Sequence, residues 1–466
     1  SKVSACVRCN AGSTTEYFEC LQGLKQWCVA SPILFSLFIN SLAREVLSRG
    51  RHGISLSRDP HQVELFVLLF ADDLLLLSDT VVGLQNQISV LYEAALRARL
   101  SVNTDKTKVV VFRNGGYLAE REVWHYGREK LEVVGSYKYL GLVFSTRLSC
   151  NVALRDVEPR AKRGTIEILC ALRRMNCNAP TIFFKLFDTQ IVPMLLYAAE
   201  IWGFQKIEAI EKVHLMACKK VLGVSSRAPN TLVYGELGRY PLYVISAARC
   251  IMFWFRLLKQ PPTRYSRMAY DMLLQMHERG KKTWVTNVKN LLCCSGFGYV
   301  WLFGGVGNEK QFISDLKLRL RDCFCQEWFS HLENSTHFEL YNSFKTCLER
   351  EKYVNLMHTS NYSKTLARFR IGVSEINAHR FRFSKQPRKQ LCPFCPQAIE
   401  DEIHVVFNCP AYTDLRNKLL IISRHVSQRL QLVNLFKCNN YEGQHNFSKF
   451  LFLLIKKRRQ GVVTQS

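Results

Sequence analysis

The chain has 466 residues, of which 48% are apolar and 22% charged, and its formal net charge at pH 7 is +26. This length predicts roughly two to four domains, and no apolar run approaches the ~20 residues that a membrane span needs. The N-terminal residues lack the basic and then apolar layout of a signal peptide. The charge is uneven, with a net +3 over residues 1–150, +12 over 151–300 and +11 over 301–466. Phosphate backbones are the expected counter-surface for the two basic segments.

The 18 cysteines are scattered along the chain without a framework of even spacings. This usage is typical of a reducing, intracellular compartment, where most cysteines act as small core residues, and we expect a nuclear and cytoplasmic location. Cys6 and Cys9 have a metal-like spacing, but no second pair lies nearby, so we interpret them as structural.

An apolar run from Leu65 to Leu77 is interrupted only by Asp72 and Asp73. Two short apolar runs broken in the middle predict a tight β-hairpin, although no Gly stands at the turn to supply a positive φ. Two adjacent carboxylates between apolar strands cost free energy unless a cation lies against them. Oxygen ligands suit Mg²⁺. The pair is therefore a candidate metal site, and the alternative is an exposed turn that carries two Asp.

The segments after the hairpin predict an α+β region up to about residue 145. Apolar residues at Leu84, Ile88, Leu91 and Ala95 mark one face of a helix over 81–99. A polar loop then leads into a β-branched strand at 109–112.

From about residue 155 the apolar period becomes helical. The pattern predicts one helix through Ile166, Leu169, Cys170 and Arg173, and a second through Ile182, Leu186 and Gln190. A third is predicted over Glu208–Leu222, with Gly223 as its C-cap. Pro261 and Pro262 form a plausible linker, and residues 263–360 are predicted to be mainly helical.

Residues 360–391 hold eight basic side chains and one acidic side chain. Arg368, Arg370, Arg380 and Arg382 alternate with Phe369, Phe381 and Phe383. Such a pattern can grip a nucleic-acid backbone and stack on bases. A strand with a solvated Arg face and a buried Phe face is the alternative.

Four residues of the types that Zn²⁺ prefers follow in one short segment: Cys392, Cys395, His404 and Cys409. Thiolates with an imidazole favour Zn²⁺ over Mg²⁺ or Ca²⁺, and four protein ligands predict a closed structural site. Chance placement is the alternative. A further helix is predicted over Leu419–Leu432. Near the C-terminus, Lys456–Arg459 is either a nuclear-import signal or a solvated basic end.

In their order and spacing, these segments resemble the palm of a non-LTR (LINE-type) retrotransposon reverse transcriptase. Residues 21–42 resemble motif B of that family, Phe70–Asp73 motif C, residues 103–112 motif D, and Tyr139–Gly141 motif E. Residues 191–203 resemble the thumb signature and 234–242 the region after it, and the Cys/His cluster resembles the C-terminal CCHC zinc knuckle. The resemblance covers nearly the whole chain, most firmly residues 20–145 and 390–412.

The resemblance implies an α+β fold in which a partial palm (1–145) precedes a mainly helical thumb (146–260). A mainly helical connecting region (261–360) follows. The last part (361–466) would hold the basic segment, a small zinc knuckle and a helical tail.

The family's activity is RNA-directed DNA polymerisation, a two-metal displacement with Mg²⁺ or Mn²⁺. An RNA template, a DNA primer and deoxynucleotides are the implied partners. By resemblance, the functional residues are Asp72 and Asp73 as metal ligands, Lys106 near the leaving pyrophosphate, Gln26, Ser31 and Pro32 at the nucleotide and template pocket, and Tyr139, Leu140 and Gly141 as the primer grip.

Two departures from the family pattern stand out. The family needs another Asp from motif A, upstream of motif B, and no such string occurs among the residues before Gln26. Trp27 replaces a Gly that lets the backbone approach a ligand closely, and Ala30 is a milder change. Two hypotheses follow: the C-terminal part of an RNA-directed DNA polymerase, truncated before motif A and inactive alone, or a nucleic-acid-binding remnant without catalysis.

Overall fold

The computed structural model describes residues 3–6, 14–20, 29–56, 63–113, 115–177, 179–356, 361–382, 386–423, 425–438 and 440–463. Cys9, Gln26, Trp27 and Phe383, all candidates on sequence grounds, lie outside the described residues. The chain divides into two compact units. The first comprises Ser1–Ser149 with Gln260–Arg279, and the second comprises Cys150–Lys259 with Gly280–Ser466. The finer division into four parts stays a prediction.

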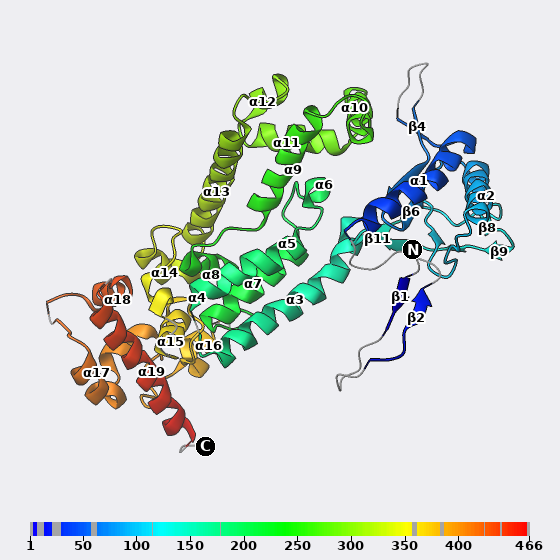
Figure 1. Cartoon of the computed structure of the whole chain (residues 1–466). Helices are drawn as coiled ribbons and strands as arrows, with labels where there is room; N and C mark the ends of the chain where they lie inside the picture. The colour runs from blue at the N-terminus through cyan, green and yellow to red at the C-terminus, as the bar shows by residue number, and fades with distance from the viewer. Residues whose placement is uncertain are drawn as a thin grey trace. The chain divides into compact units, whose positions relative to one another are not determined.

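The first unit combines helices with short strands, which confirms the predicted mixture (Figure 1). In the described part of this unit the strands pair in twos, antiparallel except for the parallel pair of β7 with β10. Its elements are β1 (Val3–Ala5), β2 (Phe18–Cys20), α1 (Ser31–Arg49), β3 (Ile54–Ser55), β4 (Glu64–Leu65), β5 (Val67–Phe70), β6 (Asp73–Leu76), α2 (Val81–Arg97), β7 (Lys108–Val109), β8 (His125–Tyr126), β9 (Glu129–Lys130), β10 (Glu132–Val133), β11 (Ser136–Tyr139), β12 (Leu142–Ser145) and α10 (Tyr265–Glu278).

The core of the first unit lies between α1, α2 and the β5–β6 hairpin. The predicted apolar face of α2 is confirmed, because Ile88, Leu91 and Ala95 are buried. Leu91 and Ala95 pack in one cluster with Leu42 and Val46 of α1. Helices α1 and α2 therefore pack against the hairpin that carries the two carboxylates.

The second unit is helical among its described elements. They are α3 (Cys150–Arg174), α4 (Pro180–Leu186), η1 (Phe187–Ile191), α5 (Val192–Leu195), α6 (Ala199–Trp202), α7 (Glu208–Leu222), α8 (Asn230–Leu237), α9 (Tyr243–Leu258), α11 (Trp284–Cys294), α12 (Gly298–Leu302), α13 (Glu309–Glu333), η2 (Thr336–Phe338), α14 (Glu339–Phe344), η3 (Lys352–Leu356), α15 (Asn361–Arg370), α16 (Asn377–Arg380), η4 (Pro387–Gln390), η5 (His404–Asn408), η6 (Pro410–Tyr412), α17 (Thr413–Leu419), α18 (Gln428–Lys437) and α19 (Tyr441–Val463). One apolar cluster runs from Leu154 of α3 to Ile455 of α19. The segments predicted as thumb and tail thus share a core.

The predicted helices of the thumb segment are found, but two of their buried faces differ. Helix α7 has the predicted bounds, and Gly223 caps it in the left-handed conformation with φ +67°. In α3 and α4, however, Ile166 and Ile182 are exposed, whereas Ile168 and Phe183 are buried. Both helices carry apolar residues on more than one face, so spacing alone does not decide which face meets the core.

The single helix predicted over Leu419–Leu432 is wrong. Helix α17 ends at Leu419, and α18 begins only at Gln428. The Ser427 side chain accepts a hydrogen bond from the Leu430 N–H and so starts a new helix. None of the helices among the described residues is both long and apolar enough to cross a membrane.

Candidate functional site

The two candidate metal ligands lie at the tip of the predicted hairpin. Strands β5 and β6 are antiparallel, and Phe70 pairs with Asp73, so Ala71 and Asp72 form a two-residue turn. Ala71 has φ +52° and is the one turn residue with a positive φ, as in a type II′ turn, where Gly is the usual residue at that position. A non-Gly residue in this conformation stores strain, which is frequent at functional sites.

The tip of the hairpin is open to solvent. Asp72 and Asp73 are exposed, and the Phe70 side chain keeps 62% of its surface accessible. The described residues bring no third His, Cys, Asp or Glu to converge with these two carboxylates. The donor set fits Mg²⁺ or Mn²⁺ chemically, but it supplies only two carboxylates.

The candidate primer-grip residues lie close to this hairpin. Strands β11 and β12 form a second hairpin whose turn is Leu140 (φ +47°) and Gly141 (φ +84°). Burial, with a smaller contribution from the charge of Asp73, raises the pKa of Tyr139. The Tyr139 phenol is therefore near enough to Asp73 to sense its charge.

The loop that carries Lys106 is tied to the second hairpin. The Tyr137 hydroxyl donates to the Lys106 carbonyl oxygen at 3.0 Å. The Lys106 N–H donates to the Asn103 side-chain oxygen at 3.0 Å, which shapes the loop. The Lys106 side chain itself is exposed. These two hydrogen bonds fix the backbone of the loop, while the Lys106 side chain remains exposed to solvent.

Ser31 and Pro32 form the first residues of α1, where Pro is well accommodated. Gln26, their predicted companion, lies outside the described residues. Just beyond them, α1 leaves a row of large apolar side chains exposed: Ile33, Leu34, Leu37 and Phe38.

Arg370 is not a surface residue, which corrects its assignment as a nucleic-acid contact. Its side chain is 4% exposed and pairs with the fully buried Glu236, Nε to Oε2, at 2.8 Å. It also pairs with Glu351 at 3.0 Å and donates to the Phe436 carbonyl at 2.6 Å. Because the segment forms helix α15, and not a strand, Arg370 and Phe369 both point into the core.

The three other arginines of this segment differ in their surroundings. Arg368 donates from Nε to the Gly223 carbonyl at 2.7 Å and so caps the end of α7. Arg382 lies against Gly372 and is half-buried, and burial lowers its pKa. Arg380 is exposed and lies 5.6 Å from the Phe381 ring centroid. Of the four, Arg380 is the freest to meet a ligand.

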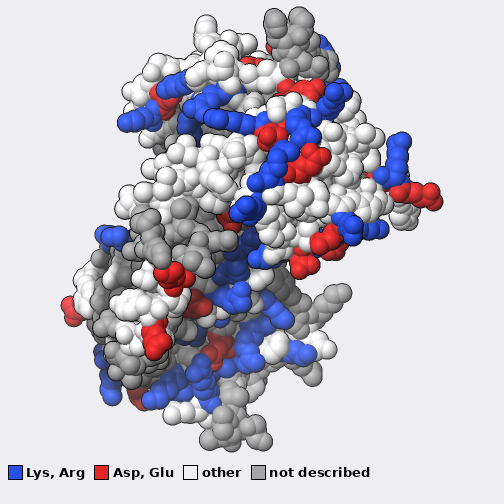
Figure 2. Space-filling view, turned by 45° about the vertical axis from the view of Figure 1, so that its right-hand side comes forward, with Lys and Arg blue, Asp and Glu red and all other residues white. Residues whose placement is uncertain are grey.

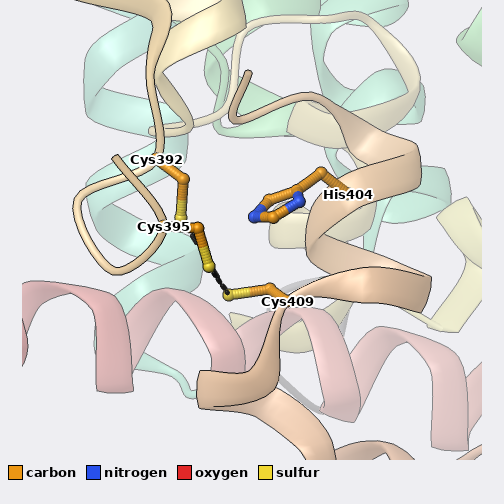
Figure 3. Close-up of side chains that lie close together, drawn as sticks. All are labelled: Cys392, Cys395, His404 and Cys409. Carbon is orange, nitrogen blue, oxygen red and sulfur yellow. Dashed lines mark hydrogen bonds between the residues drawn. The ribbon is translucent and has the colours of Figure 1, made fainter. Parts of the chain in front are cut away.

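The four predicted zinc ligands converge (Figure 3). Their ligand atoms all lie within 4.8 Å of one another, and Cys409 Sγ lies 4.0 Å from Cys392 Sγ and 3.8 Å from Cys395 Sγ. Cys392 and Cys395 come from a turn in which the Cys392 N–H donates to the Ala398 carbonyl at 2.8 Å.

One buried atom supports a metal at this cluster. The His404 Nε2 atom is buried and has no hydrogen-bond partner among the described residues, and in Figure 3 the imidazole faces the three thiols. An unpaired buried imidazole nitrogen costs free energy, and a metal ion bound to it removes that cost. Three sulfurs and one nitrogen at this spacing fit tetrahedral Zn²⁺.

A set of polar contacts around the cluster was not predicted from the sequence. Arg416 donates to the Cys409 carbonyl at 2.9 Å. Arg458 of α19 forms a two-pronged ion pair with the buried Glu400, with N–O distances of 2.6 and 2.8 Å. His379 Nε2 and Glu402 Oε1 share a hydrogen bond of 2.7 Å, and Glu402 lies two residues before His404 in the sequence. These contacts tie the cluster to α16 and α19.

The contacts of α19 also bear on the basic end of the chain. Arg458 is buried against Glu400, and Arg459 pairs with Glu375. Arg458 therefore serves the fold, whereas Lys456, Lys457 and Arg459 remain exposed.

Comparison with known proteins finds a family match within the first unit. The family model described as "Reverse transcriptase (RNA-dependent DNA polymerase)" matches residues 2–144. The retrovirus-related Pol polyprotein from type-2 retrotransposable element R2DM of Drosophila melanogaster is 28% identical over 165 residues. That alignment covers 33% of this chain and 15% of the relative, so the chain spans a small part of the relative's length. The matched segment, which contains both hairpins, is therefore similar to reverse transcriptases, and the relative comes from a retrotransposable element.

Proposed function

We propose that the chain is the C-terminal part of an RNA-directed DNA polymerase that copies RNA into DNA by two-metal nucleotidyl transfer. The observation that carries this proposal is the pair Asp72 and Asp73, exposed on a hairpin tip within a reverse-transcriptase match. Divalent cations would supply charge stabilisation at the transferring phosphate. Partners would be an RNA template, a DNA primer and deoxynucleotides.

The neighbouring residues have proposed roles of their own. Asp72 and Asp73 would hold Mg²⁺ or Mn²⁺, and the exposed Lys106 ammonium would face the leaving pyrophosphate, where a cation stabilises developing charge. Tyr139, Leu140 and Gly141 would position the primer end against this site. Ser31 and Pro32, with Gln26, would shape the pocket for nucleotide and template.

A second function is favoured by one specific observation. Asp72 and Asp73 supply two carboxylates at the hairpin where the two-metal reaction uses three, and the described residues bring no further ligand there. The alternative is therefore a nucleic-acid-binding remnant of such an element, without catalysis.

The test is primer extension with the 466-residue chain, Mg²⁺, deoxynucleotides and an RNA template annealed to a DNA primer. We expect the chain to bind primer–template with a steep salt dependence but not to extend the primer. Asp72→Ala is the test variant, and Asp79→Ala removes an exposed carboxylate three residues after the strand for comparison. Extension by the chain that is lost in Asp72→Ala and kept in Asp79→Ala would contradict the expected inactivity.

We propose further that the Cys/His cluster binds one Zn²⁺ as a structural knuckle. Cys392 and Cys409 are buried, and the contacts around the cluster run to α16 and α19, which suits a site that ties the tail together. Metal analysis should find about one zinc per chain. The zinc should be lost in Cys392→Ser with Cys395→Ser and kept in the matched pair Cys293→Ser with Cys294→Ser, which lie outside the cluster. Fully folded protein without zinc would refute the knuckle.

A further inference from the structure

Three cations from two helices meet at the end of a third helix. Arg173 lies in the last turn of α3, and Lys364 and Arg368 lie one turn apart on α15. We call these three residues the basic cluster. Arg368 caps the α7 C-terminus at the Gly223 carbonyl, and a Cβ at Gly223 would lie 3.0 Å from the Lys364 Cδ atom. Helix α15 therefore crosses the end of α7.

The charges of Arg173 and Arg368 are close enough to Lys364 to change its pKa. Burial lowers the pKa of Lys364 first, and the charges of Arg173 and then Arg368 lower it further. Within the described part of the chain, none of the three residues forms an ion pair with a carboxylate. The acidic group that Arg368 does influence is Glu375, and Glu375 is already paired with Arg459.

The helix ends nearby do not neutralise the cluster. The C-terminal ends of α3 and α7 each contribute about −0.5 charge, which is less than the three positive charges present. Like charges held together without counter-charges cost free energy, and a bound anion would recover that cost. The basic cluster therefore has the electrostatics of an anion-binding site on the helical second unit.

We propose that the basic cluster binds phosphate groups of a nucleic-acid backbone, an inference that rests on the proposed function. Residues 151–466 carry a net charge of +23, the sum of the two basic segments. Figure 2 shows Lys and Arg side chains over both the upper and the lower part of the face drawn. So large an excess of positive charge suits a polymer of phosphates better than a single phosphate ion. The cluster would hold the duplex or its single-stranded continuation without reading sequence.

The test variant removes two charges and keeps the fold. Arg173→Gln changes an exposed residue, and Lys364→Met removes the ammonium but keeps the stem that packs on Gly223. Arg368 is left unchanged because it caps α7. The matched control is Arg160→Gln with Lys212→Met, which removes two charges from helices α3 and α7 at residues that pair with Asp156 and Glu208. Circular dichroism checks that each variant is folded.

Fluorescence anisotropy with a labelled RNA–DNA primer–template is measured from 50 to 300 mM salt. Each phosphate contact contributes about 0.9 to the slope of log affinity against log salt. We expect the cluster variant to lower the slope by about two and the control by less than half of one. Equal slopes for the cluster variant and the control would overturn the basic cluster but leave the proposed function standing.

Two other outcomes also decide the proposal. If the unaltered chain does not bind primer–template at all, both the proposed function and the basic cluster fall. If inorganic phosphate at low millimolar concentration protects the unaltered chain against heat, but not the cluster variant, while both bind primer–template equally, the cluster is a phosphate-ion site and the nucleic-acid proposal is overturned.

Discussion

Replacing Arg370 with Met tests the reassignment of this residue from ligand contact to buried structural cation. Its guanidinium is 4% exposed and bridges the fully buried Glu236 and the half-buried Glu351. The Tyr353 hydroxyl also donates to Glu236. Removing the cation leaves the Glu236 carboxylate in the core with one neutral donor, because the methionine side chain supplies none.

Breaking a buried ion pair by removing one partner costs about 3–5 kcal/mol. With a denaturant slope of roughly 2.5 kcal/mol per M urea, the midpoint of urea unfolding should fall by roughly 1–2 M. The assay is urea unfolding followed by far-ultraviolet circular dichroism, whose signal comes mainly from the helices of the second unit. Glu236→Gln combined with Arg370→Met should recover a large part of the loss, since no buried charge then lacks its partner.

The comparison variant is Arg429→Met, because Arg429 pairs with Glu339 where both side chains are exposed. An exposed pair contributes about 0–1 kcal/mol, so its midpoint should move little. A midpoint for Arg370→Met no lower than that of Arg429→Met, together with weaker binding of primer–template, would refute the structural role and restore the nucleic-acid contact.

Three further variants test local features of both units. Thr80→Ala removes the side chain that accepts from the Gly83 N–H at the start of α2, and it should destabilise the first unit by about 1 kcal/mol in thermal unfolding. Ala71→Gly should relieve the positive φ at the hairpin turn and stabilise that unit by up to about 1 kcal/mol; a destabilisation would contradict the strained turn. A hydrogen bond from Arg459 lowers the pKa of Glu375, so this pair stabilises the second unit at neutral pH and the contribution is lost as pH falls through the lowered pKa. Glu375→Gln should therefore flatten the acid side of the melting-temperature profile, and an unchanged profile would contradict the pairing.

Features with a local cause were predictable from the sequence. The β5–β6 hairpin follows from two apolar runs around two Asp, and α7 from its apolar period with Gly223 at the end. The Cys392–Cys409 cluster follows from residue type and spacing within one short segment. In each of these features the deciding residues are near neighbours in the chain.

Features that depend on distant partners were not predictable in the same way. The local sequence predicts an exposed Arg370, because its buried partner Glu236 lies 134 residues away in the chain. The ion pair of Arg458 with Glu400 spans 58 residues and joins the terminal helix to the segment of the Cys/His cluster. Similarly, Ile166 faces solvent because the core side of α3 is set by the helices packed against it. A single sequence does not show which of several apolar faces will be covered.

The proposed metal site at Asp72 and Asp73 is tested most directly by locating where a divalent cation binds in the first unit. Mn²⁺ can be titrated into the chain with isotope-labelled leucine methyl groups, since paramagnetic broadening marks residues near the ion. We expect the methyl signals of Leu74 and Leu140, which follow Asp73 and Tyr139 in the sequence, to broaden first. Asp72→Asn with Asp73→Asn should abolish this effect. Broadening that begins elsewhere, or that survives this double substitution, would contradict a metal site at the hairpin.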